Sequence, residues 1–393
     1  MMTIREGIRS LKRISVREIR RLCSNPLYFF CMIVAPIGSL FFLMTLMQGG
    51  LPTNLPVAVV DLDNTPTSRR LIRQLDAFEQ TAVTMQCASF EEARREMQKG
   101  NIYGIYHIPK GLQREASSGK RPKLSFYTNG SFLIAGSLMF RDMKTTSVLA
   151  GGAVGLQIGE AKGYTTDQIM AQIQPIVIDT HAIGNPWLNY SIYLNNAILP
   201  GLLQLLIFIV TVFSIGTEIK DRTSRDWLNM GHGSITISVL GKLFPHTLIF
   251  TCIGWLICAI LYGYNAFPLQ SGWMPMLVAM FLLVIASQAL GVFMISVLPT
   301  VRLGLSLASL FGMLGFSICG LSYPVSAMYP EFHAVSYLYP LRHYLLIYID
   351  QALNGRELIY TWAEYVWLAG FIVLPVIMRK YLKNAMLYFH YIP

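Results

Sequence analysis

LFPHTLIFTCIGWLICAILY, residues 243–262, opens the longest interval of the chain without a charged side chain, which extends from Leu243 to Val301. A second apolar run, WMPMLVAMFLLVIASQALGVFMISV at 273–297, follows it, and the turn-rich segment GYNAFP at 263–268 lies between the two. A bilayer core about 30 Å thick needs ~20 mostly apolar helical residues for each span. The interval therefore predicts two membrane-spanning helices joined by a short loop.

The rest of the chain has the same character. Of its 393 residues, 53% are hydrophobic and 13% are charged, against roughly 25% charged in a soluble domain. A soluble surface needs more ionised groups, and a disordered chain requires low hydrophobicity, so both classes are excluded. Four further spans are expected at about Leu27–Met47, Tyr193–Gly216, Leu303–Gly320 and Ile359–Met378. The predicted fold class is a membrane α-helical protein with six transmembrane helices and an inserted extracytoplasmic α/β domain.

Lys and Arg predict the orientation. They gather in residues 1–26, in 217–242 and in 379–393, and are sparse in the short loops on the other side. The positive-inside rule then puts both termini in the cytoplasm of a multi-pass protein of the cell (inner) membrane. The net charge of +10 needs no nucleic acid, because anionic lipid headgroups can balance the basic N-terminus. The expected order is a cytoplasmic amphipathic helix at 1–26, a span at 27–48, an extracytoplasmic domain at 49–190, five spans within 191–378 and a cytoplasmic tail at 379–393.

The inserted domain alternates strand-like and helix-like patterns, which is typical of an α/β fold. Only Cys87 among the six cysteines lies there, so no internal disulfide is expected, and no metal-ligand spacing occurs. Helices are expected at 67–79, after the capping residue Ser89, and at 131–159. Strands are expected at Pro56–Val60, Thr81–Met85, Ile102–Ile108, Lys123–Tyr127 and Pro175–Asp179.

Asp61-Leu-Asp63-Asn-Thr65 matches the DxDxT signature of haloacid-dehalogenase-type phosphatases, in which the first Asp attacks phosphorus. The alternative is that Thr65 caps a helix whose first residue is Pro66. The phosphatase also requires a later Lys and an acidic pair that holds Mg²⁺, and only Asp179 sits at a later strand end. The cap is the favoured interpretation.

Four motifs stand in order along the chain. They are Arg17-Glu18-Ile-Arg20-Arg21 with Asn25-Pro26; Val57-Ala-Val-Val-Asp61-Leu-Asp63-Asn64; Glu218, Thr223, Trp227-Leu228 and Gly241-Lys242; and Gly320-Leu-Ser-Tyr323-Pro324 with Tyr339-Pro340-Leu-Arg-His-Tyr344. Together they resemble the ABC-2 type permeases, which are membrane subunits of ATP-binding-cassette exporters. The loop 217–242 could also be a solvated loop that obeys the positive-inside rule, and Gly231-His-Gly233 stands where the family has a proline. The large domain at 49–190 is similar to one subgroup of the family.

The resemblance implies a permease that acts as a dimer, with a second copy or a paralogue, on two cytoplasmic ATPase subunits. The loop 217–242 would dock in a groove on the ATPase, with Trp227 and Leu228 as buried anchors and an i, i+4 pair of Glu218 with Arg222 stiffening its helix. No Gly-x4-Gly-Lys-Ser/Thr motif occurs, so ATP and Mg would be held by the partner and this chain would bind no cofactor. A periplasmic adaptor is a further expected partner.

The N-terminal segment has apolar residues near helical spacing opposite basic ones. This pattern predicts an amphipathic helix in the interface, with its apolar face toward lipid or the first span. The apolar positions are Ile4, Ile8, Leu11, Ile14, Ile19 and Leu22.

Uncharged polar residues are the candidates for a translocation path, because no clear charge lies inside a predicted span. They are Asn195, Asn196, Gln204, Ser287 and Gln288, and the alternative is that they join helices to one another. His246, one turn after Lys242, is interpreted as interfacial.

The Met- and Phe-rich composition favours a lipophilic or amphipathic substrate. The rival function is a membrane-anchored receptor or assembly scaffold.

The hairpin 321–358 between the last two spans is apolar at its start and contains Pro324 and Pro330. Proline removes a backbone donor, so broken helical segments are expected over 321–345, dipping into the outer leaflet as an outer gate. Tyr323, Tyr339 and Pro340 are its candidate residues. An ordinary extracellular loop with an aromatic belt is the alternative.

Overall fold

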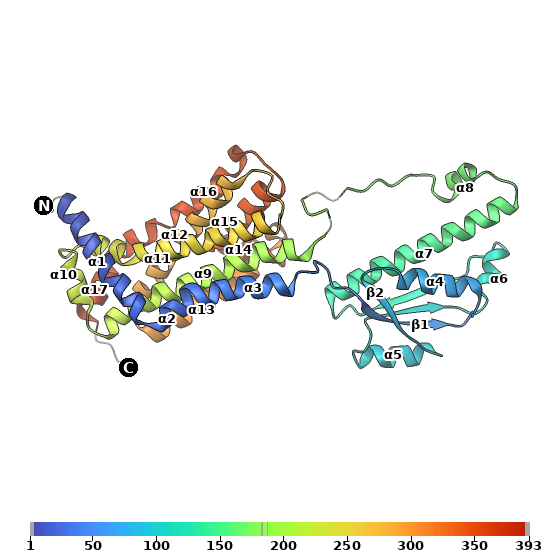
Figure 1. The fold of residues 1–393 in the computed structure, drawn as a ribbon, viewed down its shortest axis with the longest axis horizontal. Coiled ribbons are helices and arrows are strands. Elements are labelled where there is room, and N and C mark those ends of the chain that lie inside the picture. Colours follow the sequence, from blue (N-terminus) through green and yellow to red (C-terminus); the bar gives the residue numbers. More distant parts are fainter. Residues whose placement is uncertain (1–3, 182–183, 187, 390–393) are drawn as a thin grey trace. The chain divides into compact units, whose positions relative to one another are not determined.

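The structure is a computed structural model that describes residues 4–181, 184–186 and 188–389. The chain divides into two compact units, one formed by Met1–Gln48 with Ala182–Pro393 and the other by Gly49–His181. Figure 1 shows the first, unit 1, as a helical bundle and the second, unit 2, as a sheet covered by helices. A membrane α-helical fold with an inserted α/β domain is therefore confirmed.

Unit 1 contains six helices that are long and apolar enough to cross a membrane, among the residues described. Three of them include a π-helical or broken segment but run on as one span. Their bounds are Pro26–Leu46 (α2, Pro26–Phe29; η1, Phe30–Val34; α3, Ala35–Leu46), α9 (Tyr190–Lys220), Ile235–Tyr264 (α11, Ile235–Cys258; η2, Ala259–Tyr264), α12 (Trp273–Val297), α13 (Val301–Ile318) and Leu358–Tyr388 (α16, Leu358–Gly370; α17, Val373–Tyr388).

The shorter helices of unit 1 complete the bundle at its two ends. In Figure 1, α1 begins and α17 ends beside α10, while α3 ends and α9 begins at the opposite end. We call these the α10 end and the far end. The shorter elements are α1 (Ile4–Ser24), α10 (Ser224–Met230), η3 (Val325–Ala327), α14 (Pro330–Ser336), α15 (Pro340–Ile347) and η4 (Tyr348–Leu353).

Two helices of unit 1 are longer than the sequence predicts. The third spanning helix begins at Ile235, not after Lys242, so the loop expected at 217–242 shortens to residues 221–234 around α10. The tail expected at 379–393 is helical through Tyr388 as part of α17, and its last four residues lie outside the described part of the chain. Charged residues continue these helices because their side chains find partners or solvent at the α10 end.

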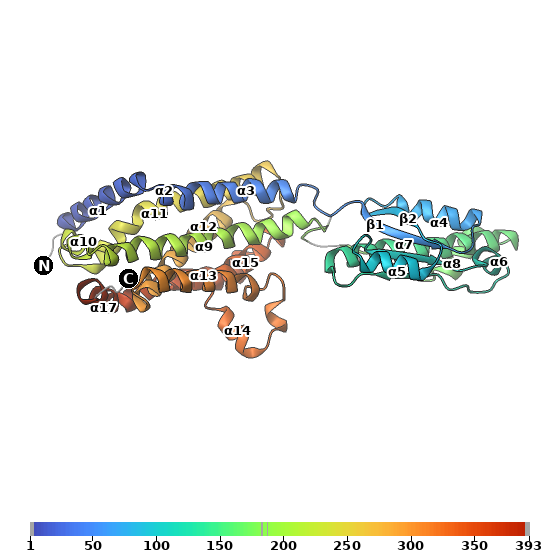
Figure 2. The same ribbon diagram turned by 90° about the horizontal axis from the view of Figure 1, so that it is seen from below.

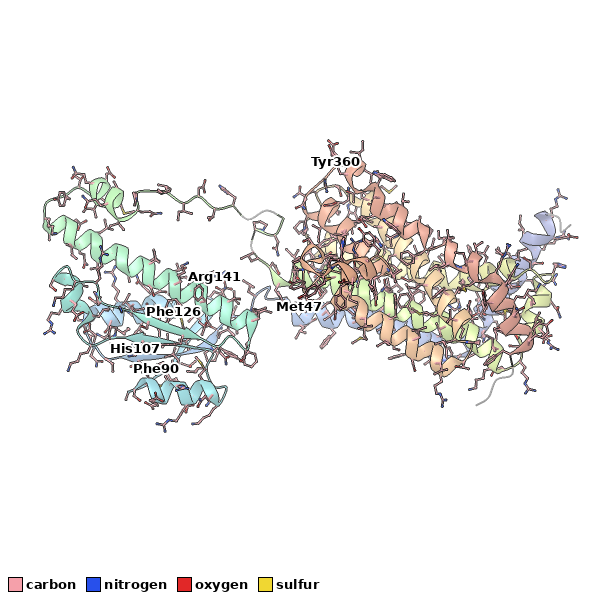
Figure 3. All side chains as sticks on the ribbon, turned by 180° about the vertical axis from the view of Figure 1, so that it is seen from behind. Met47, Phe90, His107, Phe126, Arg141 and Tyr360 are labelled. Atoms are coloured by element: carbon pink, nitrogen blue, oxygen red, sulfur yellow. The ribbon has the colours of Figure 1, made fainter. Side chains whose placement is uncertain are left out.

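Unit 2 is built on a four-stranded sheet in the order β2-β1-β3-β4, in which only β4 is antiparallel to its neighbour. In Figure 3, α7 covers one face of the sheet and α5 the other, where Phe90 lies beside His107. The elements are β1 (Leu55–Asp61), α4 (Pro66–Asp76), β2 (Thr81–Gln86), α5 (Phe90–Gln98), β3 (Gly104–Ile108), α6 (Leu112–Ser117), β4 (Ser125–Thr128), α7 (Leu133–Ala161) and α8 (Thr166–Ile173).

The strand predicted at Pro175–Asp179 is wrong. These residues follow α8 without pairing to any described strand, and Ile176, Val177 and Ile178 are 73–84% exposed. An apolar run becomes a strand only when a neighbour supplies hydrogen bonds along its edge. In this fold β2 and β4 are the two edge strands of the sheet, and neither pairs with residues 175–179.

The DxDxT motif in unit 2 caps two helices. Thr65 accepts a hydrogen bond from the Ser68 amide, and the Asp61 carboxylate accepts one from the Ser68 hydroxyl at 2.6 Å. The Asp63 carboxylate accepts from the amides of Gly111 (2.8 Å) and Gln113 (3.1 Å), at the start of α6. Burial alone would raise the pKa of Asp63, but its bonds from Thr65 and these amides hold it below the ordinary value. The capping role predicted for Thr65 is confirmed.

Candidate functional site

At the α10 end, α1 packs tightly along the first half of α11. Ile14, Glu18 and Leu22, at i, i+4 and i+8, form its buried face. The Ser15 hydroxyl donates to the Gly241 carbonyl at 2.8 Å, and a Cβ at Gly241 would lie 3.0 Å from the Ile14 side chain. Glycine at 241 therefore lets the two helices approach. The partner of α1 is α11 and not the first span; Ile8 and Ile19 are left exposed, as a lipid contact requires.

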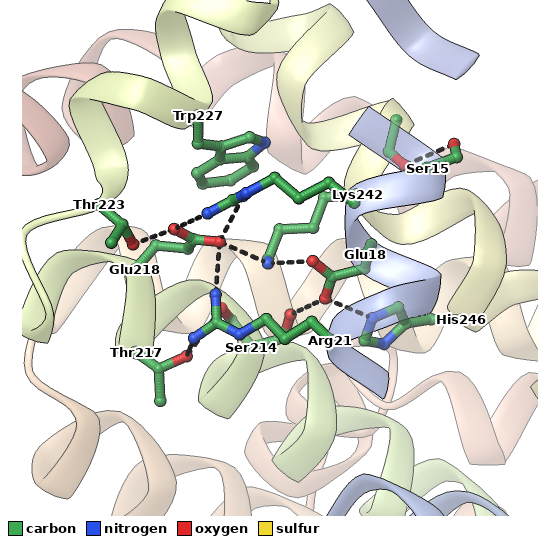
Figure 4. Close-up of polar contacts among 12 residues, drawn as sticks. Ser15, Glu18, Arg21, Ser214, Thr217, Glu218, Thr223, Trp227, Lys242 and His246 are labelled. Carbon is green, nitrogen blue, oxygen red and sulfur yellow. Dashed lines mark hydrogen bonds and ion pairs between the residues drawn. The ribbon is translucent and has the colours of Figure 1, made fainter. Parts of the chain in front are cut away.

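Six ionisable side chains meet beneath this contact, and we call them the charge cluster (Figure 4). They come from α1, from the last turn of α9 and from the second turn of α11 onward. The members are Arg17, Glu18, Arg21, Glu218, Lys242 and His246.

Glu218 is the centre of the charge cluster and is fully buried. Arg17 donates to both of its carboxylate oxygens, at 2.8 and 2.9 Å, and Arg21 donates to Oε1 at 2.5 Å. Lys242 Nζ lies 3.0 Å from the same oxygen, and the Thr223 hydroxyl donates to Oε2. A bidentate Arg–carboxylate pair is strong and directional. Glu218 therefore holds α1, α9 and α11 together at one point.

Glu18 forms the second anionic centre. Its carboxylate accepts from Lys242 Nζ at 2.7 Å, from the Ser214 hydroxyl at 3.0 Å and from His246 Nε2 at 3.0 Å. A carboxylate only accepts, so the His246 proton is on Nε2. Burial alone would raise the pKa of Glu18, but the bond from His246 and the charge of Lys242 lower it to about 2. Glu18 is therefore ionised, and Lys242 bridges the two carboxylates.

Trp227 and Leu228 are buried inside this chain and are not exposed anchors, which corrects the sequence-based expectation. Trp227 is 0% and Leu228 4% exposed. The Trp227 ring lies under Lys242 Nζ, 5.2 Å from its centroid, and Nε1 donates to the Ser238 carbonyl at 3.1 Å. These contacts fix α10 onto the charge cluster. Its exposed face instead carries Arg225, Asp226 and Asn229.

One other expected feature of this region is wrong. Glu218 does not pair with Arg222, because α9 ends at Lys220 and Arg222 has a left-handed φ of 59°. Its partners come instead from α1. Of the N-terminal motif, Arg17, Glu18 and Arg21 belong to the charge cluster, and Arg20 is exposed, as expected for the basic face of α1.

The polar residues proposed to line a path are all buried between helices. Asn195 donates to Ser191, and Asn196 accepts from the Tyr262 hydroxyl at 2.8 Å. The side chain of Gln204 has no hydrogen-bond partner among the described residues, and Gln288 Oε1 accepts a hydrogen bond from the Thr247 hydroxyl at 2.7 Å. Gln288 lines a groove between α11, α12 and α17. The path stays a prediction.

The hairpin is broken where the prolines predict. Figure 2 shows α14 projecting from the bundle after α13 ends, and α15 returns into it. Tyr339 is 3% exposed and stacks on Phe311 with ring centroids 4.2 Å apart, and Pro340 begins α15. Tyr323 is 54% exposed beside Pro324. The broken helices are confirmed, and the gate stays a prediction.

Sequence analysis named Lys242 in a family motif and interpreted His246 as interfacial, but it did not place either residue in a buried charge cluster. The signal was present but weak: Glu18 occupies the apolar stripe of α1 between Ile14 and Leu22, and Lys242 and His246 share one face of α11. Charges on apolar stripes point to buried partners. Those partners lie about 200 residues apart, so no local pattern pairs them.

A bundle of six spanning helices with a buried charge cluster at one end defines a multi-span membrane protein. Residues 26–378 match the family model described as ABC-2 family transporter protein, and the chain belongs to that family. It is also similar to the linearmycin resistance permease protein LnrN of Bacillus subtilis (strain 168), with 30% identity over 109 residues. That match covers 28% of each chain, so this chain spans a minority of its relative's length.

Proposed function

We propose that this chain is the permease subunit of an ATP-binding-cassette exporter, driven by a separate ATPase subunit. Family membership over 26–378 and the permease named among its relatives support this function. The observation that carries it is the charge cluster, which ties α1, α9, α10 and α11 into one block. A block held by buried ion pairs can transmit the movement of a docked ATPase to two spanning helices.

The ATPase docks on the exposed face of α10 in this proposal, because Trp227 and Leu228 are occupied within the chain. The α10 end then lies in the cytoplasm of the cell (inner) membrane, and unit 2 lies outside. This orientation is supported by the exposed Arg20, Lys380 and Arg225 at that end. ATP and Mg belong to the partner, and this chain binds no cofactor.

The remaining assignments complete the proposal. The permease works as a dimer with a second copy or a paralogue, and a periplasmic adaptor contacts unit 2, which is the large external domain of one ABC-2 subgroup. The substrate is a lipophilic or amphipathic molecule, in keeping with the resistance named for the relative. Its path passes Asn195, Asn196 and Gln204, and the hairpin with Tyr339 gates the outer end. Gln288, which the sequence placed on the same path, is left out of it because it lines the groove between α11, α12 and α17.

The test is a steric block on α10. Asn229→Trp adds bulk to the exposed face without entering the core, and Glu357→Trp, at the exposed start of α16, is the matched control at the far end. Each variant is purified from native membranes and the amount of ATPase that co-purifies with it is measured; the wild-type complex is also reconstituted, and its ATP hydrolysis is measured. We expect Asn229→Trp to abolish co-purification and the control to retain it. Equal behaviour of the two variants would reject docking on α10.

A membrane-anchored scaffold is the alternative function. It predicts no nucleotide-dependent change in the labelling of Cys319, a buried cysteine next to the hairpin. A permease predicts that labelling by a thiol reagent changes when the ATPase binds ATP. The same reconstituted complex serves for both measurements.

A further inference from the structure

An apolar groove of about 670 Å³ runs between α11, α12 and α17 in unit 1. This volume is within the range of about 300–1,000 Å³ that holds small ligands in proteins. Its wall on α11 extends from Ile235 to Trp255, which is ~30 Å at 1.5 Å for each residue. Phe244 and Trp255, two of its aromatic side chains, are 53% and 44% exposed. Because α11, α12 and α17 belong to helices long and apolar enough to span a membrane, an opening on their outer side would face the hydrocarbon core.

One cation stands at the edge of this apolar surface. Arg379 of α17 is the single charged residue among those described as lining the groove, and it is exposed. Its guanidinium has no hydrogen bond or ion pair with another residue in the described part of the chain. It lies one turn before Lys383, whose Nζ donates to the Gly233 carbonyl at the α10 end. Arg379 is therefore placed near headgroup depth.

An unpaired donor lies inside the groove. Gln288 is 4% exposed, and its Oε1 accepts from the Thr247 hydroxyl at 2.7 Å. Its Nε2 has no acceptor among the described residues, and neither does the buried hydroxyl of Thr251, which also lines the groove. A buried donor without a partner costs free energy, so an acceptor on a bound molecule would stabilise this site.

We propose that the groove binds one anionic glycerophospholipid, with its phosphate on Arg379, an ester carbonyl on Gln288 Nε2 and an acyl chain along α11. Three features select this occupant. The apolar wall excludes a free anion, the exposed guanidinium favours an anionic over a zwitterionic headgroup, and the amide donor needs an acceptor close to the apolar chain. The site requires no ATPase, so it is independent of the proposed transport function.

Trp255 reports on the site directly. The full chain is reconstituted with phosphatidylglycerol or phosphatidylcholine carrying brominated acyl chains, and quenching of tryptophan fluorescence is measured. The contribution of Trp255 is obtained by difference from a Trp255→Phe variant. We expect phosphatidylglycerol to bind about fivefold more tightly than phosphatidylcholine, the ratio that about 1 kcal/mol for one interfacial cation produces. Salt should reduce this preference.

Two variants and a control decide the assignment. Arg379→Gln should remove the preference, whereas Lys380→Gln, the adjacent exposed cation that does not line the groove, should keep it. Gln288→Leu should weaken both lipids equally. A preference that survives Arg379→Gln, or that Lys380→Gln removes to the same extent, would show general surface charge and overturn the proposal. Unchanged binding in Gln288→Leu would overturn the ester contact.

Discussion

Glu18→Gln is the substitution that tests most directly how much the charge cluster stabilises the packing of α1. The amide keeps the shape of the side chain but removes the negative charge that Lys242 and His246 face at 2.7 and 3.0 Å. The pKa of Glu18 falls from an ordinary 4.5 to about 2 in the folded chain, which corresponds to about 3 kcal/mol at 1.36 kcal/mol for each pH unit. Removing one partner of a buried ion pair costs about 3–5 kcal/mol. The loss should lie at the lower end of this range because Lys242 retains its ion pair with Glu218. We therefore expect a loss of about 3 kcal/mol.

The assay is amide hydrogen exchange of α1 in the reconstituted full chain, which measures its local opening. Protection of α1 should fall roughly hundredfold in Glu18→Gln, by the relation of 1.4 kcal/mol to a factor of ten, and by little in Arg20→Gln, an exposed control on the same helix. Because the pKa of Glu18 is depressed on folding, its contribution is complete above pH 4.5 and is lost as the pH falls from 4.5 toward 2. That loss should be absent in the variant. Equal protection in the two variants would refute the reasoning.

Two other substitutions test the internal role of motif residues. Trp227→Ala should destabilise the whole bundle by about 3–5 kcal/mol, as expected when a fully buried aromatic leaves a cavity, and should lower the thermal midpoint of the solubilised chain; an intact midpoint with lost ATPase binding would restore Trp227 as a partner anchor. Thr65→Ala should cost unit 2 about 1 kcal/mol through loss of the α4 cap, seen as faster exchange of α4 amides, and unchanged exchange would contradict the capping role.

The spanning helices and most of unit 2 were predictable because their signals are local. A charge-free interval such as Leu243–Val301 indicates membrane-spanning helices by its composition alone, and Pro324 prevents a straight helix from continuing through it because proline has no backbone donor. The strands from Leu55 to Thr128 follow the same logic, since apolar runs between turns were correctly located. The segment at Pro175–Asp179 failed because strand formation depends on a neighbour that the fold does not supply.

The candidate site was only partly predictable because its physics is non-local. Arg17, Glu18 and Glu218 could be selected from motifs, but their pairing across about 200 residues could not. A large apolar side chain such as Trp227 has the same sequence pattern whether it packs in its own chain or in a partner. Lys242 looked like the end of a loop, and only the opposing carboxylates explain its place inside α11.

The central claim is that an ATPase engages the exposed face of α10 and moves the block held by the charge cluster. A photo-crosslinking phenylalanine analogue at Asn229, introduced in native membranes, measures this contact. Tyr264, 88% exposed at the far end, is the control position. We predict that Asn229 yields one adduct with an ATPase subunit, that its yield changes with nucleotide, and that Tyr264 yields none. No ATPase adduct at Asn229 while the complex co-purifies, or the same adduct from Tyr264, would contradict the account.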